Sequence, residues 1–256
     1  MILLKTKDEI KKMREAGRIT ALILQELAER VRPGVSAYEL DQYAERRAKK
    51  LKAVPAFKNY APPGSSLRYP ASLCVSINEE VVHGIPLRSK VIKEGDVVSL
   101  DFGIYKNGYY GDAALTIGVE PLDDKKRKLI EVTKKALEIG IKNVKIGNRL
   151  SDISAAIQRF VESNGFSVIR DFAGHGIGRF LHEEPQVPNF GVPGMGPEIE
   201  EGMTFALEPM VTMGSWEVKI LSDGWTAVTV DGSVAAHFEH TVAVIGGGVE
   251  ILTEAE

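Results

Sequence analysis

Apolar residues recur every three or four positions in four parts of the chain, which is the spacing of helices that bury one face. The first stretch follows a capping box formed by Thr6 and Glu9, in which each end residue satisfies a free amide of the first turn, and its apolar stripe covers residues 10–31. A second box, formed by Ser36 and Glu39, starts the next helix. The same spacing predicts helices at residues 124–143 and 151–164.

Two stretches of strand character, residues 97–104 and 109–119, flank the pair Asn107-Gly108. This pair favours a two-residue hairpin turn, because both central positions of a type I′ turn need a positive φ. Counting outward from the turn places Asp101 and Asp112 on the same face, as diagonal neighbours roughly 7–8 Å apart at the backbone. We therefore expect the two carboxylates to converge on one site.

A short repeat relates two parts of the chain. Residues 94–101 (EGDVVSLD) are echoed in register by residues 201–208 (EGMTFALE), and both segments follow a pair of predicted helices. Each copy ends in an acidic residue, Asp101 or Glu208. The chain is therefore predicted to form one compact α+β domain of two related halves, with these two residues placed symmetrically about a central site.

Composition narrows the class of protein. With 256 residues, 44% hydrophobic and 26% charged, the chain is long enough for a substantial core and has the composition of a globular protein. A net charge of −3 gives no basis for tight nonspecific binding of nucleic acid. Cys74 is the single cysteine, which excludes an intramolecular disulfide and favours a reducing compartment. No apolar run is long enough to span a bilayer, so we expect a cytoplasmic protein without a membrane partner.

Five residues indicate the chemistry: Asp101, Asp112, His175, Glu208 and Glu239. Four carboxylates gathered without cations would repel one another and take up protons. Two divalent ions would compensate these charges, and a mixture of oxygen and imidazole ligands suits Mn, Fe, Co or Zn. Glu208 lies in the apolar segment FALEPM, where an unpaired buried carboxylate is costly. These residues favour a two-metal hydrolase.

The five histidines differ in their surroundings. Glycines flank His175, which lets backbone approach a ligand closely, and His182 follows in the same segment. His83 precedes a glycine in VVHGIP. A single histidine is more often structural than catalytic, and these spacings do not match the i, i+4 pattern of a single-zinc metalloprotease helix. His237 and His240 are interpreted as peripheral, although His240 adjoins the last acidic residue and is placed to orient it.

Together these segments resemble the methionine aminopeptidase family over essentially the whole chain. The motifs that carry the resemblance are VVHGIP with His83, the pair Asp101 and Asp112, GHGIG with His175, HEEPQVPN with His182, LEPM with Glu208, DGWT with Trp225 and FEHT with Glu239. The resemblance implies the "pita-bread" fold, an antiparallel β-sheet with pseudo-twofold symmetry flanked by helices. It also implies a single catalytic domain, residues 1–256, with halves at roughly 1–120 and 121–256.

The resemblance also implies a role for each ligand. Asp101 would hold one ion and His175 the other, with Glu208 beside His175, while Asp112 and Glu239 would bridge the two. The cofactors would be two divalent ions, Co, Mn, Fe or Zn, holding a water or hydroxide that is nucleophilic near neutral pH.

Three residues are expected by resemblance to act on the substrate. Glu208 would be the general base that relays a proton to the leaving amine. His182 would contact the scissile carbonyl or the developing oxyanion, and His83 would assist near the scissile amide.

The substrate pocket is expected to accept an unbranched thioether. The residues implied to bind substrate are Tyr60, Tyr69, Cys74, His83, His182 and Trp225. The chain departs from many bacterial relatives at two places: Phe57 stands where some carry a second cysteine, and residues 61–68 lengthen the loop before Tyr69. Pro62 and Pro63 are expected to stiffen that loop.

The activity implied by the resemblance is removal of the initiator methionine from nascent proteins whose second residue is small. The partners would be nascent polypeptide N-termini and, transiently, the ribosome, and the enzyme would be a monomer. The chain begins at its first helix and has no room for the helical insertion of type II enzymes between Glu208 and Glu239, so it resembles a bacterial type I enzyme.

Two other functions remain open from the sequence. An Xaa-Pro aminopeptidase or prolidase shares the fold and the five ligand types, but such enzymes usually carry an additional N-terminal domain and differ around the last two ligands. A non-catalytic pita-bread protein that binds RNA or protein would be favoured by loss of ligands, and all five are present.

Overall fold

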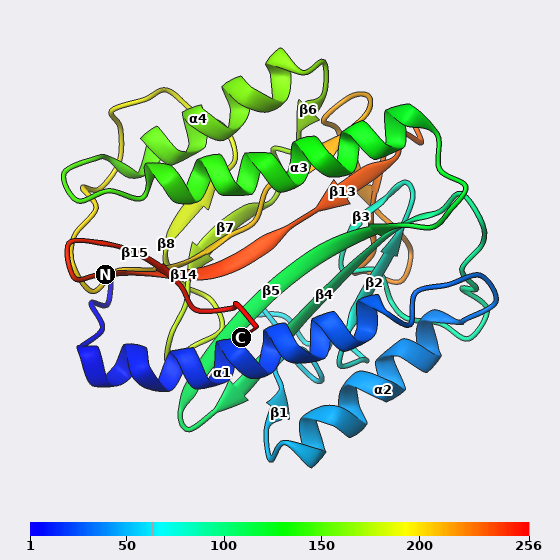
Figure 1. Cartoon of the computed structure of the whole chain (residues 1–256), viewed down its shortest axis with the longest axis horizontal. Helices are drawn as coiled ribbons and strands as arrows, with labels where there is room; N and C mark the ends of the chain where they lie inside the picture. Colours follow the sequence, from blue (N-terminus) through cyan, green and yellow to red (C-terminus); the bar gives the residue numbers. More distant parts are fainter. Residues whose placement is uncertain (63, 256) are drawn as a thin grey trace.

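The helices lie close to where the apolar spacing places them. The computed structural model of the chain describes residues 1–62 and 64–255 (Figure 1). Its helices are α1 (Lys7–Ala28), α2 (Ala37–Lys50), α3 (Asp124–Asn143) and α4 (Leu150–Ser163). Both capping boxes are present. The helix predicted at 124–143 is confirmed at both ends, and the one predicted at 151–164 begins and ends one residue earlier.

The first helix is shorter than its apolar stripe. α1 ends at Ala28, and the N–H groups of Arg30 and Val31 donate to the carbonyls of Leu27 and Ala28 in tight turns. Pro33 follows, and a proline disfavours helical backbone at the residue before it. Val31 is partly buried against the core under α1 and α2 although it lies outside the helix.

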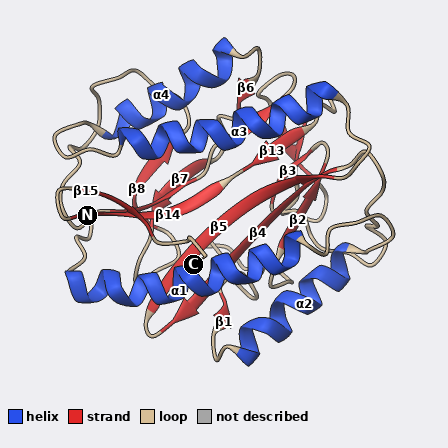
Figure 2. Cartoon of the chain, in the orientation of Figure 1, coloured by secondary structure: helices blue, strands red, loops and turns tan. Residues whose placement is uncertain are grey.

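The strands form one large antiparallel sheet and two small ones (Figure 2). The large sheet runs β1-β4-β5-β14-β9-β7-β8, with β2 also paired to β4 and β15 to β14. The small sheets run β13-β10-β6 and β11-β12-β3. The strands are β1 (Val54–Pro55), β2 (Cys74–Ile77), β3 (Glu80–Val82), β4 (Val97–Lys106), β5 (Tyr109–Gly118), β6 (Ser167–Val168), β7 (Ala173–Gly176), β8 (Glu183–Pro188), β9 (Thr204–Leu207), β10 (Met210–Thr212), β11 (Val218–Ile220), β12 (Ala227–Thr229), β13 (Ala235–His237), β14 (Glu239–Ile245) and β15 (Gly248–Ile251).

The helices lie over the large sheet in two pairs, and both chain ends lie between the pairs in the view of Figure 1. The pair α1 and α2 packs with β4 and β5 around buried residues that include Leu24, Leu40 and Phe102. The pair α3 and α4 packs with β9 and β14 around Leu129, Phe205 and their neighbours. The expected α+β architecture, an antiparallel sheet flanked by helices, is confirmed.

Within the part of the chain that the structure describes, the helices are all either too short or too polar to cross a membrane.

Candidate metal centre and active site

The hairpin of β4 and β5 has the predicted register. Gly103 pairs with Asp112 and Asp101 pairs with Ala114, and the pairing is continuous along the whole hairpin. The two aspartates therefore lie on one face, in adjacent rows of the sheet. Rows two residues apart along a strand are separated by roughly 6.6–6.8 Å at the backbone.

The first of these rows continues across the sheet through two glutamates. Ala114 pairs with Glu239 at the start of β14. His240 pairs with Leu207, so the same register continued by one residue places Glu208, just after β9, opposite Glu239. Asp101, Glu239 and Glu208 thus share one row.

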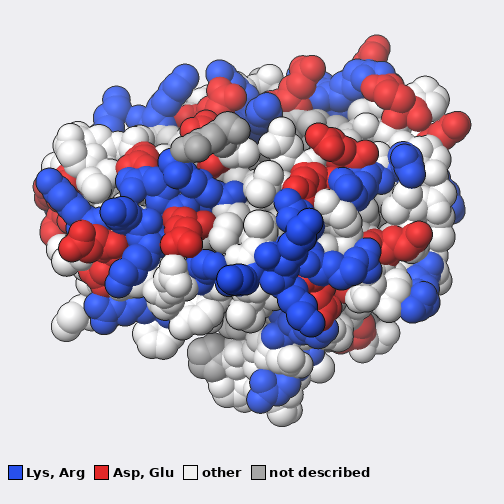
Figure 3. All heavy atoms as spheres, turned by 60° about the horizontal axis from the view of Figure 1, so that its bottom comes forward, with Lys and Arg blue, Asp and Glu red and all other residues white. Residues whose placement is uncertain are grey.

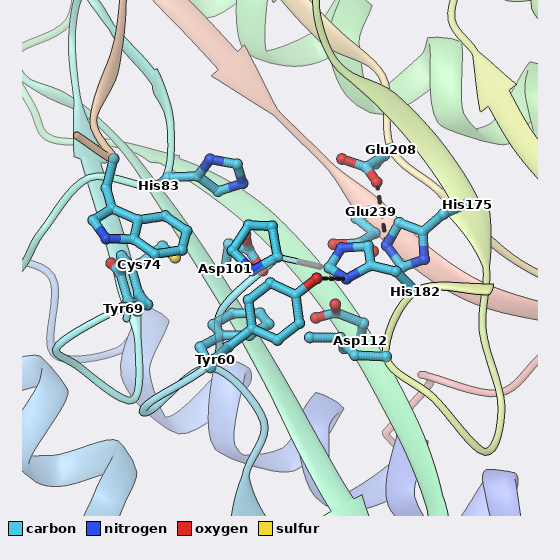
Figure 4. A pocket seen from close by; sticks show the side chains of 14 residues that line it. Tyr60, Tyr69, Cys74, His83, Asp101, Asp112, His175, His182, Glu208 and Glu239 are labelled. Atoms are coloured by element: carbon cyan, nitrogen blue, oxygen red, sulfur yellow. Dashed lines mark hydrogen bonds and ion pairs between the residues drawn. The ribbon is translucent and has the colours of Figure 1, made fainter. Parts of the chain in front are cut away.

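The second row joins Asp112 to His175 through two small residues. Thr241 accepts a hydrogen bond from the Asp112 N–H (2.9 Å) and donates to the Asp112 carbonyl (2.8 Å). Thr241 pairs with Ala206, and Ala206 pairs with His175 on β7. Two adjacent rows of one face therefore carry all five candidate ligands, which converge in Figure 4.

The carboxylates are placed for cations rather than for hydrogen bonds. Within the described residues, Oδ1 of Asp101, Oδ1 of Asp112 and Oε1 of Glu239 are buried without a hydrogen-bond partner. One ligand atom each of Asp112, His175 and Glu239 lie within 4.8 Å of one another. Because buried charges are paired or coordinate metals, this donor set fits divalent cations.

Burial also sets the protonation of the carboxyl groups. It raises the pKa of Asp112 to about 7. Burial, followed by repulsion from the neighbouring carboxylates, raises the pKa values of Asp101, Glu208 and Glu239 well above their usual range. Without cations the site therefore retains protons near neutral pH, and bound cations would favour the charged forms.

His175 is held as a neutral imidazole. Its Nδ1 lies 2.9 Å from the carbonyl oxygen of Gly176, to which the ring donates a hydrogen bond. Its Nε2 then carries the lone pair and lies 3.6 Å from Oε1 of Glu208. Burial lowers the pKa of His175 to about 4. The backbone contact therefore selects the tautomer that a metal needs.

His182 reaches the same site from the loop before β8. Its ring centroid lies 4.2 Å from that of His175, and its Nδ1 lies 2.7 Å from the hydroxyl of Tyr60. Burial, followed by the nearby His175, lowers the pKa of His182 to about 3. The imidazole is therefore neutral and bound on one nitrogen, which leaves the other for a ligand.

His83 enters from the opposite side of the cavity. Its φ of 59° is in the left-handed region, a strained conformation that is often found at functional sites. Its ring meets Phe172 and Trp225 edge to face, with centroids 5.4 Å and 6.3 Å away. Burial, followed by His182, lowers the pKa of His83 to about 4.

A cavity of about 180 Å³ adjoins the candidate ligands. At its aromatic end Tyr69 and Trp225 form a T-shaped pair with centroids 5.3 Å apart, and the Tyr69 hydroxyl donates to the Gly84 carbonyl at 3.0 Å. Beside the five ligands, the cavity is lined by Phe57, Tyr60, Pro62, Tyr69, Cys74, His83, Leu181, His182 and Trp225. All of the residues expected to bind substrate therefore meet there, together with Leu181, which the sequence reasoning missed although it precedes His182 directly.

Residues 61–62 and 64–68, the loop expected to be longer than in many bacterial relatives, lie at this aromatic end. Pro62 lines the cavity. Leu67 packs against Gly224, where an added Cβ would lie 2.6 Å from the Leu67 Cδ2. Since Gly224 precedes Trp225, Pro62 and Leu67 both lie near the part of the pocket that Trp225 lines. Pro63, which was expected to stiffen the loop, lies outside the described residues.

The interpretation of His237 as peripheral is wrong. His237 is only 2% exposed, and its Nε2 is buried 3.8 Å from Oε2 of Glu208. Burial, followed by His83, lowers its pKa to about 3. The sequence contained a signal, because His237 stands two positions before Glu239 and so shares its face at strand spacing. His240 lies on the other face, where its Nδ1 is 2.9 Å from Oγ1 of Thr253.

The chain matches the model of metallopeptidase family M24 over residues 11–245. It is 51% identical over 253 residues to the methionine aminopeptidase of Clostridium perfringens. It is also 51% identical over 253 residues to methionine aminopeptidase 1 of Bacillus subtilis. Both alignments cover 99% of this chain and 99% of the relative.

Solved structures of proteins similar to this chain have the same fold. The crystal structure of methionine aminopeptidase from Thermotoga maritima is 51% identical and superposes with a TM-score of 0.96, covering 99% of this chain and 100% of that one. The prolidase from Pyrococcus furiosus has the same fold at a TM-score of 0.79, but it is 22% identical, and the match covers 99% of this chain and 66% of the prolidase.

Proposed function

This chain belongs to metallopeptidase family M24, and we propose that it is a methionyl aminopeptidase that removes the N-terminal methionine of nascent proteins whose second residue is small. The observation that carries the proposal is the cavity itself, in which a pocket partly lined by aromatic side chains adjoins four carboxylates and an imidazole. Methionine aminopeptidases that are 51% identical over 99% of their length support the same activity.

We propose that two divalent ions bind here, with Co, Mn, Fe and Zn as the candidates for this donor set. Asp101 would hold one ion and His175 the other, with Glu208 beside His175. Asp112 and Glu239 lie in the two adjacent rows and would contribute to holding both ions. When bound, such ions supply Lewis acidity and make water nucleophilic near neutral pH.

Glu208 is the proposed general base. Its Oε1 faces His175, and its Oε2 faces His237, so the two oxygens have separate neighbours. One oxygen remains able to accept the proton of the attacking water and to return it to the leaving amine. Burial raises the pKa of this carboxyl group well above its usual range in the metal-free site, and bound cations would favour its charged form, which is the form that accepts a proton.

His182 is the proposed partner of the scissile carbonyl. When the Tyr60 hydroxyl donates to Nδ1, the other ring nitrogen carries the proton and is able to donate to an oxyanion. Removing such a donor typically costs about 2.7–4 kcal/mol at the transition state. His83 is proposed to assist at the scissile amide from the opposite side of the cavity.

The pocket is proposed to bind the methionine side chain. Tyr69, Trp225 and Cys74 form its wall, and the cavity volume of about 180 Å³ limits what enters. A thioether is flexible and makes favourable contacts with ring edges, so an aromatic wall suits it. Tyr60 stands between this pocket and His182 and is proposed to contact substrate at that boundary.

We also propose that residues 1–256 act as one catalytic domain of two halves. The first half supplies Asp101 and Asp112, and the second supplies His175, Glu208 and Glu239, all from or beside one large sheet. Neither half has a complete donor set. The two halves are thus proposed to be a single functional unit.

The partners proposed are nascent N-termini and, transiently, the ribosome, with the enzyme acting as a cytoplasmic monomer. A basic face supports contact with ribosomal RNA. Figure 3 shows Lys and Arg side chains gathered over the face that α1 and α2 form, where Arg46, Lys49, Lys50 and Lys52 are exposed. Such a cluster attracts phosphate groups even though the net charge of the chain is −3.

The deciding experiment compares peptides. Metal-stripped protein is reloaded separately with Co, Mn, Fe and Zn and is given Met-Ala-Ser, Leu-Ala-Ser and Ala-Pro. Metal-dependent cleavage restricted to Met-Ala-Ser is expected. Cleavage of Ala-Pro instead would assign the protein to the proline-specific enzymes of the same fold, and failure to cleave with every metal in folded protein would favour a binding protein.

A further inference from the structure

Lys5 forms an ion pair with Glu183 that is almost completely withdrawn from water. Both side chains are 3% exposed, whereas the pair formed by Lys90 and Glu80 is 15% and 16% exposed. The residues before Lys5 are largely exposed, so this burial is local. A buried ion pair contributes little net stability, because the cost of desolvating both charges offsets their attraction. We therefore expect this pair to have a role other than stabilising the fold.

The pair is built into the loop that carries His182. Glu183 follows His182 directly, and while its Oε2 meets Lys5, its Oε1 accepts the Phe180 N–H at 3.0 Å. Gly178 leaves the space that the lysine fills, since an added Cβ would lie 2.2 Å from the Lys5 Cε. The backbone from Gly178 to Glu183 therefore wraps around the end of one lysine side chain.

The lysine is itself fixed from two sides. Its N–H donates to the Gly202 carbonyl at 2.7 Å, beside the strand that leads to Glu208, and its Nζ donates to the Leu3 carbonyl at 2.8 Å. A second contact joins the same two regions, because Arg179 pairs with Glu9 of the first turn of α1 at 2.6 Å. The N-terminal segment thus holds the outer side of the loop while His182 faces the cavity.

We propose that Lys5 is a positioning residue for His182, acting through Glu183, an inference that rests on the proposed function. His182 has to present one nitrogen to the scissile carbonyl, and its ring contacts the Tyr60 hydroxyl and the tilted ring of His175. Its backbone position depends on the carboxylate of the next residue. If Lys5 is lost, that carboxylate leaves the interior for water and carries His182 with it.

The first test replaces Lys5 by an uncharged side chain of similar length, Lys5→Met, with Arg14→Met as the matched control. Arg14 also pairs across the fold, with Glu250, but that pair is partly exposed and does not touch the loop. On Met-Ala-Ser, Lys5→Met is expected to lower kcat by about 10- to 100-fold with little change in KM. Arg14→Met is expected to remain within about threefold of wild type.

A double-mutant cycle separates positioning from general destabilisation. In a His182→Ala background, Lys5→Met should change kcat by less than about threefold, because the group that it positions is absent. Equal losses in both backgrounds would overturn the proposal. Glu183→Gln keeps the shape of the side chain and the acceptor for the Phe180 N–H, but it weakens the ion pair with Lys5. It should therefore lower kcat less than Lys5→Met does, and again only when His182 is present. This variant replaces Lys5→Met in the test if Lys5→Met does not fold.

Hydrogen exchange in metal-free protein tests the geometry without any activity. Lys5→Met should speed exchange of amides in residues 177–183 and leave those of the β4–β5 hairpin unchanged. Unchanged exchange in the loop would overturn the proposal. If wild type fails to cleave Met-Ala-Ser, the proposed function fails, whereas wild-type cleavage together with wild-type-like Lys5→Met contradicts only the role of Lys5.

Discussion

The Nε2 atom of His237 lies 3.8 Å from Oε2 of Glu208, on the carboxylate oxygen that His175 does not face. The backbone of His237 is fixed at this place, because Oγ1 of Thr116 accepts its N–H at 3.0 Å and donates to its carbonyl at 2.7 Å. A buried imidazole thus stands beside the oxygen that is proposed to carry the proton.

We expect His237→Leu to lower kcat by about 10-fold or more, because the free oxygen of Glu208 loses its polar neighbour. His237→Gln, which retains a donor, should stay within about threefold of wild type. Steady-state kinetics give both values, and calorimetry should show little change in metal affinity. Wild-type turnover by His237→Leu would contradict this role.

Metal-free protein should lose stability as the pH rises through and above about 7, the folded-state pKa of Asp112. Burial raises the folded-state pKa of Asp112 from 3.8 to about 7 and raises those of Asp101, Glu208 and Glu239 well above their usual range. The folded state therefore binds more protons than the unfolded state in this window, so a rising pH favours unfolding.

The buried histidines do not oppose this trend. Burial lowers the pKa values of His83 and His175 to about 4, and those of His182 and His237 to about 3, from 6.5, so they are largely neutral in both states above pH 7. The melting temperature measured across the window tests the sign, and added Mn should remove the decline. A flat profile without metal would contradict the assignment.

The two-row arrangement predicts different losses of metal from different ligands. If the proposed assignment holds, Asp101→Asn should retain about one ion per chain, since the other ion keeps its ligands, whereas Asp112→Asn removes a ligand proposed to hold both ions and should weaken both. Metal content after dialysis measures this. Asp41→Asn is the control, because Asp41 is buried but accepts the N–H groups of Ser72 and Leu73 away from the site.

Close packing of α1 on the sheet should make Gly111 sensitive to a single methyl group. A Cβ at Gly111 would lie 2.6 Å from the backbone nitrogen of Gly17, whereas a Cβ at Gly248 would meet nothing within 4 Å. Gly111→Ala is expected to cost about 1–3 kcal/mol in the free energy of unfolding, as overpacking does. Gly248→Ala should be nearly neutral. Denaturant unfolding of metal-loaded protein compares the two.

Much of the fold follows from local patterns in the amino-acid sequence. The capping boxes at Thr6 and Ser36 and the 124–143 helix depend on neighbours within one or two turns. The register of Asp101 and Asp112 depends on one turn and a period of two. The end of the first helix was predicted wrongly. The helical spacing of apolar residues continues to residue 31, although the helix itself ends at Ala28.

The sequence by itself determined the positions of the helices and the register of the hairpin, because each depends on residues close along the chain. The candidate ligands are far apart along the chain and were identified by their chemistry and by resemblance. Only the tertiary structure decided that His237 adjoins Glu208 and that Lys5 meets Glu183 across 178 positions. Contacts of this kind arise when strands and loops from distant segments pack together. Side-chain periodicity indicates which face a residue occupies, but it does not indicate which distant residue lies opposite.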